Sequence, residues 1–302
     1  MRRYNGTPIN KHISAINRFF PYVMPDRNGS VVYLELNFEM ENALEYLKKI
    51  NKDRPKEDQI KLFDLLLAAI HRTYLERPRL NRFIIGKRYY QRNEHIYFFV
   101  SKSELTDKGK ERTVGLKLGP RDGIFEVHKK ARGDIKETKE NDTNKNDEAT
   151  LDVLFKFPRW FIRWFAKFVY KFLDNRDMMP EFFAATDSMH GSAYIANLGS
   201  FGVVDPPYHH LYDYGDISLF FVLGGLRKDA VVDQETGEIS VKTRMPVKIT
   251  IDERIADGVY FNNTFHVMNE FFQDPTKLET FPEDQKDAYP NVKYMRDGKR
   301  KK

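Results

Sequence analysis

Apolar residues recur every three or four positions in several stretches of the chain, a spacing that predicts helices with one buried face. A clear example is residues 59–75, where Ile60, Phe63 and Leu67 fall on one stripe. Pro78 ends this predicted helix because proline has no backbone N–H to continue the hydrogen-bond ladder. Further helices are predicted over residues 40–50, 154–173 and 259–272, and another begins at Ile124.

Shorter apolar or alternating runs, bounded by turn-forming residues, predict strands. Thr236-Gly237 is predicted to form the tip of a hairpin. Helices interrupt the strands without strict alternation, which favours a mixed sheet over a doubly wound parallel one. Residues 1–30 contain Pro8, Pro21 and Pro25 and are predicted to be irregular. The predicted strands are residues 31–38, 82–90, 95–101, 112–118, 191–198, 217–224, 230–232, 239–241 and 244–252.

Two neighbouring segments differ from the rest of the chain. Residues 134–150 have almost no apolar side chains, so a flexible loop is predicted. The helix at 154–174 suits a membrane surface, or the entrance for an anionic or acyl substrate. Because a hydrophobic stripe usually marks core, packing on the chain itself or on a neighbouring subunit is the favoured interpretation. This helix combines an aromatic stripe with basic residues spaced four apart: Arg159, Arg163, Lys167 and Lys171.

Composition narrows the class of protein. With 302 residues, 41% hydrophobic and 31% charged, the chain can bury one large core or two modest ones. Zero cysteines exclude disulfides, thiolate metal sites and a cysteine nucleophile. The net charge of +6 lies partly in residues 277–302, which predicts a solvated basic tail and no nucleic-acid partner. The chain begins without the apolar run of a secretory signal and has no stretch of ~20 apolar residues, so a cytoplasmic location is expected.

A strand-to-helix corner carries the best candidate chemistry. Residues 249–258 read Ile-Thr-Ile-Asp-Glu-Arg-Ile-Ala-Asp-Gly. On its own, such a corner favours local pairing of Asp252, Glu253 and Arg254, with Asp257 capping the helix that follows. The same residues resemble the D-H-R-x-x-D-G signature of the catalytic domain of 2-oxoacid dehydrogenase acyltransferases. They resemble more loosely the H-H-x-x-x-D-G signature of chloramphenicol acetyltransferases.

Three further segments resemble the same acyltransferase domain, in the same order along the chain. Residues 78–81 are similar to the family's P-x-L-N, and residues 195–202 to its I-S-N-L-G-x-F-G. Residues 273–275, Gln-Asp-Pro, follow the last helix as they often do in the family. The match runs from about residue 10 to residue 276, and the ordered set favours a shared fold.

The resemblance implies an α/β fold, namely a chloramphenicol acetyltransferase-like two-layer sandwich with a mixed β-sheet and helices on one side. It implies a single free-standing acyltransferase-like domain over residues 1–276, assembled as a homotrimer with active sites between subunits. Coenzyme A or acyl-CoA is the implied substrate, with no permanently bound cofactor. The expected function is transfer of an acyl group between coenzyme A and an unknown acceptor. The alternative is a catalytically inactive relative that binds acyl-CoA or a partner protein.

The resemblance also assigns roles to single residues. Glu253 takes the place of the family's histidine, which accepts the proton of the attacking thiol, and Ala196 takes that of the serine that helps to hold the oxyanion. Asp257, which supports the geometry of the site, and Asn197 are retained. A thiol of pKa ~8.5 gives its proton to an ordinary histidine at roughly 2.7 kcal/mol, and to an ordinary carboxylate at roughly 5.7 kcal/mol. The family's mechanism is therefore not expected to operate unchanged.

Two arrangements restore a catalytic base. In one, Glu253 itself accepts the proton. In the other, His209 or His210 supplies an imidazole, although a pair of loop histidines is more often a hydrogen-bonding pair than a catalyst. These histidines and Asp213 lack a further clustered ligand, so no metal site is predicted. The candidates for oxyanion or substrate binding are Ser192, Ala196, Asn197 and Ser200.

Overall fold

The computed structural model describes residues 3–102, 111–140, 155–179 and 187–280. The strands in these ranges are β1 Gly6–Pro8, β2 Val31–Glu39, β3 Arg82–Ile85, β4 Arg88–Arg92, β5 His95–Lys102, β6 Glu111–Leu118, β7 Ala193–Asn197, β8 Leu219–Leu223, β9 Arg227–Val232 and β10 Ile239–Asp252. The α-helices are α1 Ala15–Val23, α2 Glu41–Ile50, α3 Leu62–Glu76, α4 Ile124–Glu140, α6 Arg159–Lys167 and α8 Gly258–Gln273. Short helical turns are η1 Asn10–His12, η2 Asn28–Ser30, η3 Lys56–Asp58, η4 Pro78–Asn81, η5 Phe168–Leu173, η6 Asp174–Arg176, η7 Leu198–Phe201, η8 Glu253–Ile255 and η9 Pro275–Leu278.

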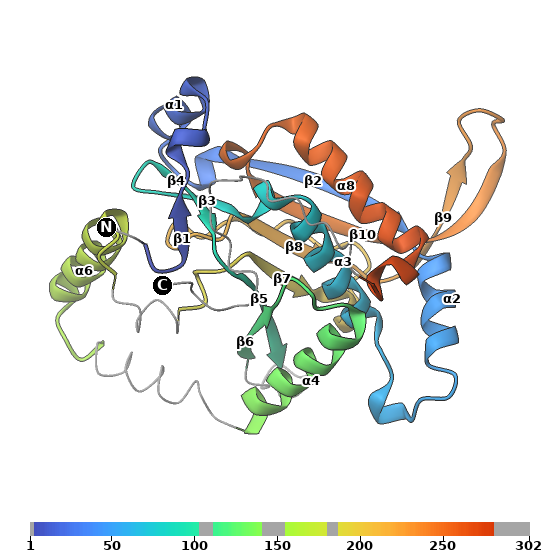
Figure 1. The fold of residues 1–302 in the computed structure, drawn as a ribbon. Coiled ribbons are helices and arrows are strands. Elements are labelled where there is room, and N and C mark those ends of the chain that lie inside the picture. The colour runs from blue at the N-terminus through green and yellow to red at the C-terminus, as the bar shows by residue number, and fades with distance from the viewer. Residues whose placement is uncertain (1–2, 103–110, 141–154, 180–186, 281–302) are drawn as a thin grey trace.

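One large mixed sheet forms the centre of the molecule (Figure 1). Its strands lie in the order β2-β10-β8-β7-β5-β6, and β9 pairs with the first half of β10. Strand β7 runs parallel to β5 and to β8, whereas the other pairs are antiparallel. The mixed sheet predicted from the order of the elements is therefore confirmed. The predicted hairpin is the ribbon of β9 and β10 that projects beyond the sheet, with Gly237 at φ +75° near its tip.

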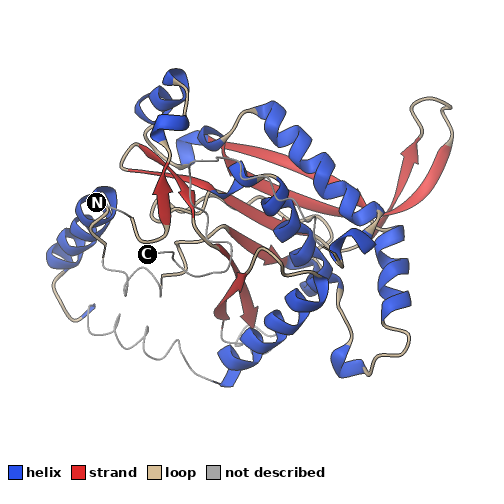
Figure 2. Cartoon of the chain, viewed as in Figure 1, coloured by secondary structure: helices blue, strands red, loops and turns tan. Residues whose placement is uncertain are grey.

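Helices α2, α3, α4 and α8 cover one face of the sheet (Figure 2). Alternate side chains of β8 and β10, such as Phe221 and Ile249, point into this layer and are fully buried. The opposite face carries Tyr194, Phe220 and Val222, which pack against loop residues that precede β8 rather than against helices. The expected arrangement of helices on one side of a mixed sheet is thus confirmed.

The N-terminal residues were predicted to be irregular, but they contain α1. Ser14 caps this helix, accepting a hydrogen bond from the Asn17 backbone N–H at 3.3 Å. Pro21 lies inside the helix and cannot donate to the Asn17 carbonyl. That carbonyl accepts a hydrogen bond from the Tyr89 hydroxyl at 2.7 Å instead, so the proline leaves no carbonyl unsatisfied.

The single strand predicted over residues 82–90 is a hairpin. Gly86 and Lys87 both have positive φ, at 56° and 62°. Two such residues form the tight turn that matches the twist of paired strands, so the chain reverses between β3 and β4. With β1, these strands form a small second sheet in the order β1-β4-β3.

Three predicted segment boundaries also shift. Helix α4 continues to Glu140, so the loop expected from residue 134 does not begin there, and residues 141–150 lie outside the described residues. The aromatic helix is helical from Arg159 to Leu173, as α6 and the π-helical turn η5. Leu278 is buried in the main core, so the domain extends past residue 276; residues 281–302 of the expected tail lie outside the described residues. Among the described residues, no helix has both the length and the apolar character needed to cross a membrane.

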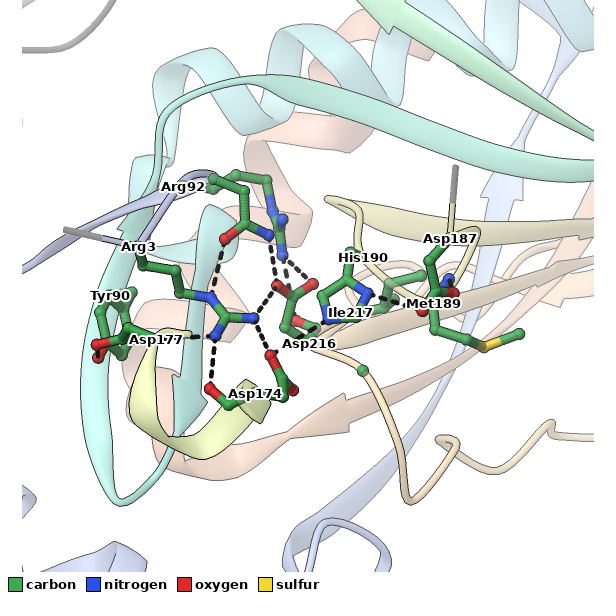
Figure 3. Close-up of polar contacts among 12 residues, drawn as sticks. Arg3, Tyr90, Arg92, Asp174, Asp177, Asp187, Met189, His190, Asp216 and Ile217 are labelled. Carbon is green, nitrogen blue, oxygen red and sulfur yellow. Dashed lines mark hydrogen bonds and ion pairs between the residues drawn. The ribbon is translucent and has the colours of Figure 1, made fainter. Parts of the chain in front are cut away.

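A buried set of charges ties the N-terminus to segments that are distant in sequence (Figure 3). Arg3 Nη2 donates to Asp174 Oδ1 at 2.7 Å, and Arg92 Nη2 donates to Asp216 Oδ1 at 2.6 Å. All four side chains are at most 5% exposed. Burial alone would raise the pKa of Asp216, but Arg92, His190 and Arg3 outweigh it and lower this pKa to about 2.

His190 belongs to the same charge cluster and faces only carboxylates among these groups. Its Nδ1 lies 3.2 Å from Asp187 Oδ2, and its Nε2 lies 3.6 Å from Asp174 Oδ1. Burial disfavours the charged imidazole, but Asp216 and the two nearer carboxylates outweigh it and raise the pKa of His190 to about 9. The cluster is closed and internally paired, so it stabilises the fold rather than forming a site open to a ligand.

Candidate active site

The charged corner begins where β10 ends, and its first and third residues pair with each other. Arg254 donates to the Asp252 carboxylate through Nε at 2.8 Å and Nη2 at 2.7 Å. Asp252 is fully buried and Arg254 is 5% exposed, so this bidentate pair is shielded from water. Arg254 Nη1 also donates to the Met24 carbonyl at 2.8 Å, which fixes the corner to the end of α1. The local-pairing interpretation therefore holds for Asp252 and Arg254.

Glu253 lies between the two paired residues, and its side chain is exposed. Among the described residues, it has no hydrogen bond or ion pair. It lines a groove with a volume of about 920 Å³, a size within the range of small-molecule sites. The paired residues on either side face inward, whereas Glu253 faces outward into the groove.

The groove runs between α8 and the edge strand β2. Strand β2 contributes alternate residues from one face, including Leu34, Leu36 and Phe38. Helix α8 contributes a stripe from Gly258 to Gln273, and α1 adds Phe20. Over its length the groove therefore has an apolar floor and one wall of helix side chains. Such a lining suits an acyl chain or another extended apolar group.

Charged groups stand at the two ends of the groove. Glu253 and Asp257 are at the beginning of α8, where Asp257 caps the helix by accepting from the Tyr260 N–H at 2.9 Å. Asp257 also lies 3.6 Å from Arg79 Nη1, as an exposed ion pair. At the other end, Arg244 Nη2 lies 3.6 Å from Glu39 Oε1, and both residues line the groove. Asp257 is therefore a helix cap that lies beside Glu253 in the groove.

Two polar groove residues were not singled out from the sequence. Asn262 and His266 lie on the same stripe of α8 as Gly258, and both side chains are exposed. Their position could have been predicted, because residues four apart share one face of a helix, and Asn262 and His266 follow Gly258 at that spacing. At 1.5 Å per residue, His266 is about 12 Å along the helix from Gly258, so it provides an imidazole in the groove but away from the corner.

The residues of the second motif lie elsewhere on the sheet. Asn197, at the end of β7, pairs with Leu223 on β8. Leu223 pairs on its other side with Val247 on β10. Glu253 follows Val247 by six positions, a separation of about 20 Å along a strand. Ala196 precedes Asn197 on β7, and Ser200 follows it by three positions, in η7. The two halves of the predicted site therefore do not meet within one chain.

The predicted serine donors already have backbone partners. The Ser192 hydroxyl is buried, accepting from the Ile96 N–H at 3.0 Å and facing the Glu94 carbonyl at 3.4 Å. The Ser200 hydroxyl donates to the Asn197 carbonyl at 2.8 Å, and the Asn197 side chain caps η7. Both hydroxyls serve local structure in the single chain.

His209 and His210 lie on the sheet face opposite α8. The His209 ring stacks on Phe220 with the ring centroids 3.9 Å apart, and its Nδ1 lies 2.6 Å from the His210 carbonyl oxygen. Burial lowers the pKa of His209. Since Phe220 belongs to the face without helices, neither histidine faces Glu253. In the described part of the chain, no three His, Asp or Glu side chains are grouped so as to hold a metal ion.

No protein-family model and no curated protein matches this amino-acid sequence. Solved structures nevertheless match its fold. A probable dihydrolipoamide acetyltransferase from Listeria monocytogenes 4b F2365 has a TM-score of 0.55 at 12% identity, covering 88% of this chain and 93% of that chain. The cubic core of the pyruvate dehydrogenase multienzyme complex has a TM-score of 0.55 at 12% identity, covering 89% and 90%. A chloramphenicol acetyltransferase has a TM-score of 0.50 at 13% identity, covering 88% and 99%.

These likenesses show that the chain has the chloramphenicol acetyltransferase-like α/β fold, shared with dihydrolipoamide acetyltransferase cores. The fold implied by the motifs in the sequence is confirmed. At 12% and 13% identity these likenesses show the fold alone.

Proposed function

We propose that this chain is an acyltransferase that moves an acyl group between coenzyme A and a second substrate, with Glu253 as the general base. The observation that carries the proposal is the position of Glu253, which is turned away from the buried pair of Asp252 and Arg254 into a groove of about 920 Å³. The fold adds support because it is also that of acetyltransferases.

The proposed reaction balances without a cofactor. Glu253 accepts the proton of the acceptor's hydroxyl, amine or thiol while that atom attacks the carbonyl carbon of the thioester. The carbonyl electrons move to oxygen and return as the carbon–sulfur bond breaks. The departing coenzyme A thiolate then takes the proton from the Glu253 carboxyl, which leaves the acylated acceptor, free coenzyme A and the starting carboxylate.

The groove suits the acyl thioester better than a small polar substrate. Its floor of Leu34, Leu36 and Phe38 offers apolar contacts to an acyl chain. Filling the groove also removes water from around the Glu253 carboxylate. His266, farther along the same wall, is a second proton acceptor within the groove.

We propose that the complete site forms between chains of a homotrimer. Asn197 and Glu253 are about 20 Å apart along the sheet of one chain, as judged from the strand register. A neighbouring chain that places its β7 end against this groove would supply the second half of the site.

The arrangement of donors also favours an alternative, in which the protein binds acyl-CoA or a partner protein without turnover. Ala196 has no hydroxyl, and the hydroxyls of Ser192 and Ser200 bond to local backbone atoms. Loss of one oxyanion donor typically lowers the rate about 10² to 10³-fold. Binding without catalysis would leave the same groove intact.

Thiol release from acetyl-CoA and longer acyl-CoAs, measured with amine, hydroxyl and thiol acceptors, tests the proposal. We expect Glu253→Gln to lower kcat by about 10²-fold or more, because the amide cannot accept the proton. Calorimetric titration should show acyl-CoA binding unchanged in this variant. Leu36→Trp should weaken that binding by filling the groove, whereas Tyr33→Trp on the opposite face of β2 should not.

His210→Ala is the matched control, since His210 lies across the sheet from the groove and should leave turnover unchanged. Turnover that survives Glu253→Gln but disappears in His266→Ala would identify His266, rather than Glu253, as the general base. Saturable acyl-CoA binding with no turnover for any acceptor would favour the binding protein. Absence of both would refute an acyl-CoA function.

A further inference from the structure

The segment from Phe155 to Leu173 exposes an unusual number of large apolar side chains. Trp160 is 72% exposed, Phe155 67% and Trp164 56%, and no residue of α6 is buried. Phe157, Phe168 and Phe172 are exposed as well. The sequence favoured packing of this face on the chain itself or on a neighbouring subunit, and within the described residues of this chain no packing buries α6.

The aromatic rings of this segment contact one another instead. Trp164 stacks on Phe168 and Phe168 on Phe172, with centroids 5.5 and 5.3 Å apart and planes within 13°. Phe161 continues the same series toward the N-terminus. In Figure 1, α6 stands apart from the sheet and from the helices that cover it. The result is a preformed aromatic face on an isolated helix about 22 Å long, including η5.

The charges of this segment all have one sign. Residues 155–173 contain nine aromatic residues and five Lys or Arg residues, with no Asp or Glu. Arg159, Arg163 and Lys167 are exposed, in the row of four-residue spacing beside the aromatic face. An aromatic face flanked by basic side chains is the composition of helices that lie in the interface of an anionic bilayer.

Two other segments extend this surface with the same character. Helix α1 turns Ile16, Phe19 and Tyr22 outward, at 68%, 62% and 60% exposure. The β3–β4 turn carries the exposed Lys87 and Arg88. Residues 1–25 and 82–93 contain no Asp or Glu, so none of the three segments brings a carboxylate to the surface.

Contacts at the β3–β4 turn join these segments into one end of the molecule. The Gly86 N–H donates to Asn175 Oδ1 at 3.2 Å, next to η5, and Lys87 Nζ lies 4.6 Å from the centre of the Tyr22 ring on α1. Arg88 Nη1 lies 3.5 Å from Asp177, whose carboxylate is 4% exposed. Asp174 and Asp177, which follow the aromatic helix, are therefore turned inward and paired.

We propose that α6, η5 and the outer face of α1 form a surface that binds the protein to anionic membranes, with α6 lying in the plane of the interface. This role goes beyond the proposed acyl transfer and does not depend on it. Aromatic side chains enter the boundary between head groups and acyl chains, while the basic row meets anionic head groups. Each basic side chain near such a surface typically strengthens binding several-fold.

Charge argues for lipid over a second copy of this chain that pairs the same surface with itself. Two copies that met through this surface about a two-fold axis would bring the same basic rows together. With no Asp or Glu in residues 155–173, the segment offers no partner charge for its own copy. An anionic lipid surface satisfies both the aromatic face and the basic row.

Tryptophan fluorescence gives a direct test because the two tryptophans of the chain, Trp160 and Trp164, are both on this helix. The full chain is mixed with vesicles of phosphatidylcholine, with and without phosphatidylserine, and bound protein is also measured by sedimentation. We expect emission to shift to shorter wavelength and protein to sediment with the phosphatidylserine vesicles. The effect should weaken as salt is added, because salt screens the basic row.

Two variants with matched controls locate the surface. Phe168→Glu should reduce partitioning at least about tenfold, because a carboxylate in the interface is both polar and repelled by anionic head groups. Val241→Glu, on the exposed ribbon of β9 and β10, makes a comparable change elsewhere and should have no effect. Lys167→Glu should weaken binding several-fold, and Lys228→Glu on β9 should not.

Two outcomes would overturn the proposal. One is the absence of sedimentation with phosphatidylserine vesicles, or sedimentation that Phe168→Glu leaves unchanged. The other is short-wavelength tryptophan emission without vesicles, together with a mass in solution that falls in Phe168→Glu. That result would identify the face as an interface between copies. Since the four substituted side chains are exposed or partly exposed, circular dichroism should confirm folding in every variant.

Discussion

Three consecutive charged residues at the end of β10 have separate roles. Asp252 and Arg254 face inward and bond to each other through two nitrogens, while Glu253 between them faces the groove. The pair also holds the end of α1 through the Met24 carbonyl. The sequence alone left open whether Glu253 or Asp252 would pair with the arginine. The helical turn η8 decides it, because the chain leaves the strand at Asp252 and Arg254 turns back onto that carboxylate, where both side chains are buried.

Stability measurements should separate these roles. Removing one partner of a buried pair leaves an uncompensated charge, so we expect Arg254→Met to lower the free energy of unfolding by about 3–5 kcal/mol. Glu253→Gln changes an exposed side chain and should alter it by less than about 0.5 kcal/mol. Urea unfolding of both variants provides the comparison. Equal losses in the two would show that Glu253 is part of the structural pair.

The His190 cluster predicts a pH dependence of stability. Because carboxylates raise the pKa of His190 from 6.5 to about 9, the folded chain holds this proton more tightly than the unfolded chain. The stabilisation is therefore fully present below about pH 6.5 and is lost as pH rises through about 9, a change on the order of 3 kcal/mol. Urea unfolding across this range should show the decline in the parent protein. His190→Gln should be less stable than the parent at low pH, and its free energy of unfolding should change less with pH. A pH dependence equal to that of the parent would contradict the role of His190.

At the scale of elements, the β3–β4 turn fixes the position of the segment that carries η5 and η6. A Cβ atom on Gly86 would lie 2.3 Å from the Asn175 carbonyl oxygen, and the residue has φ +56°. Gly237, at φ +75°, would meet nothing within 4 Å. The two glycines therefore share a left-handed backbone conformation but differ in what lies beside them.

Thermal unfolding of Gly86→Ala and Gly237→Ala should measure that difference. Each substitution places a residue with a Cβ atom in the left-handed region, which lowers the free energy of unfolding by roughly 1–2 kcal/mol. Gly86→Ala should be more destabilising by about 1–3 kcal/mol, because η6 must also move. Similar losses in the two variants would mean that the contact with Asn175 contributes little to stability.

The spacing of apolar residues predicted the elements that pack mainly through one apolar face. It did not predict the elements whose structure depends on a contact with a residue distant in sequence. Helix α8 follows directly from its pattern, whereas the strands predicted at 239–241 and 244–252 are one continuous strand, β10. Helix α1 was missed because Pro21 signals a break, and only the Tyr89 hydroxyl, far away in sequence, makes that proline acceptable. The β3–β4 hairpin was missed because apolar or aromatic residues lie on both sides of the two-residue Gly86-Lys87 turn, which is a weak signal on its own. Glu253 was predicted from its motif, whereas Asn262 and His266 become part of the site only when α8 is placed over β2.

At the scale of the whole molecule, the order of the strands separates the two motifs that suggested an acyltransferase. Strands β7 and β10 both border β8, so Asn197 and Glu253 belong to neighbouring parts of the sheet. Their positions along the strands nevertheless differ by about 20 Å. This separation depends on strand order and register, which the sequence does not reveal. Joint action of the two residues on one substrate therefore requires two chains.

Mixing two inactive variants tests this requirement. Glu253→Gln and Asn197→Ala should each abolish most turnover alone, while the proposed trimers, assembled from both, should contain sites with Glu253 from one chain and Asn197 from its neighbour. With random mixing at equal amounts, about a quarter of the sites have both intact residues, so activity should return to about a quarter of the parent level. The control refolds each variant separately and mixes them afterwards, without exchange of chains. Activity that stays absent in the co-refolded sample, although mixed trimers are present by mass spectrometry, would show that the two residues do not share a site.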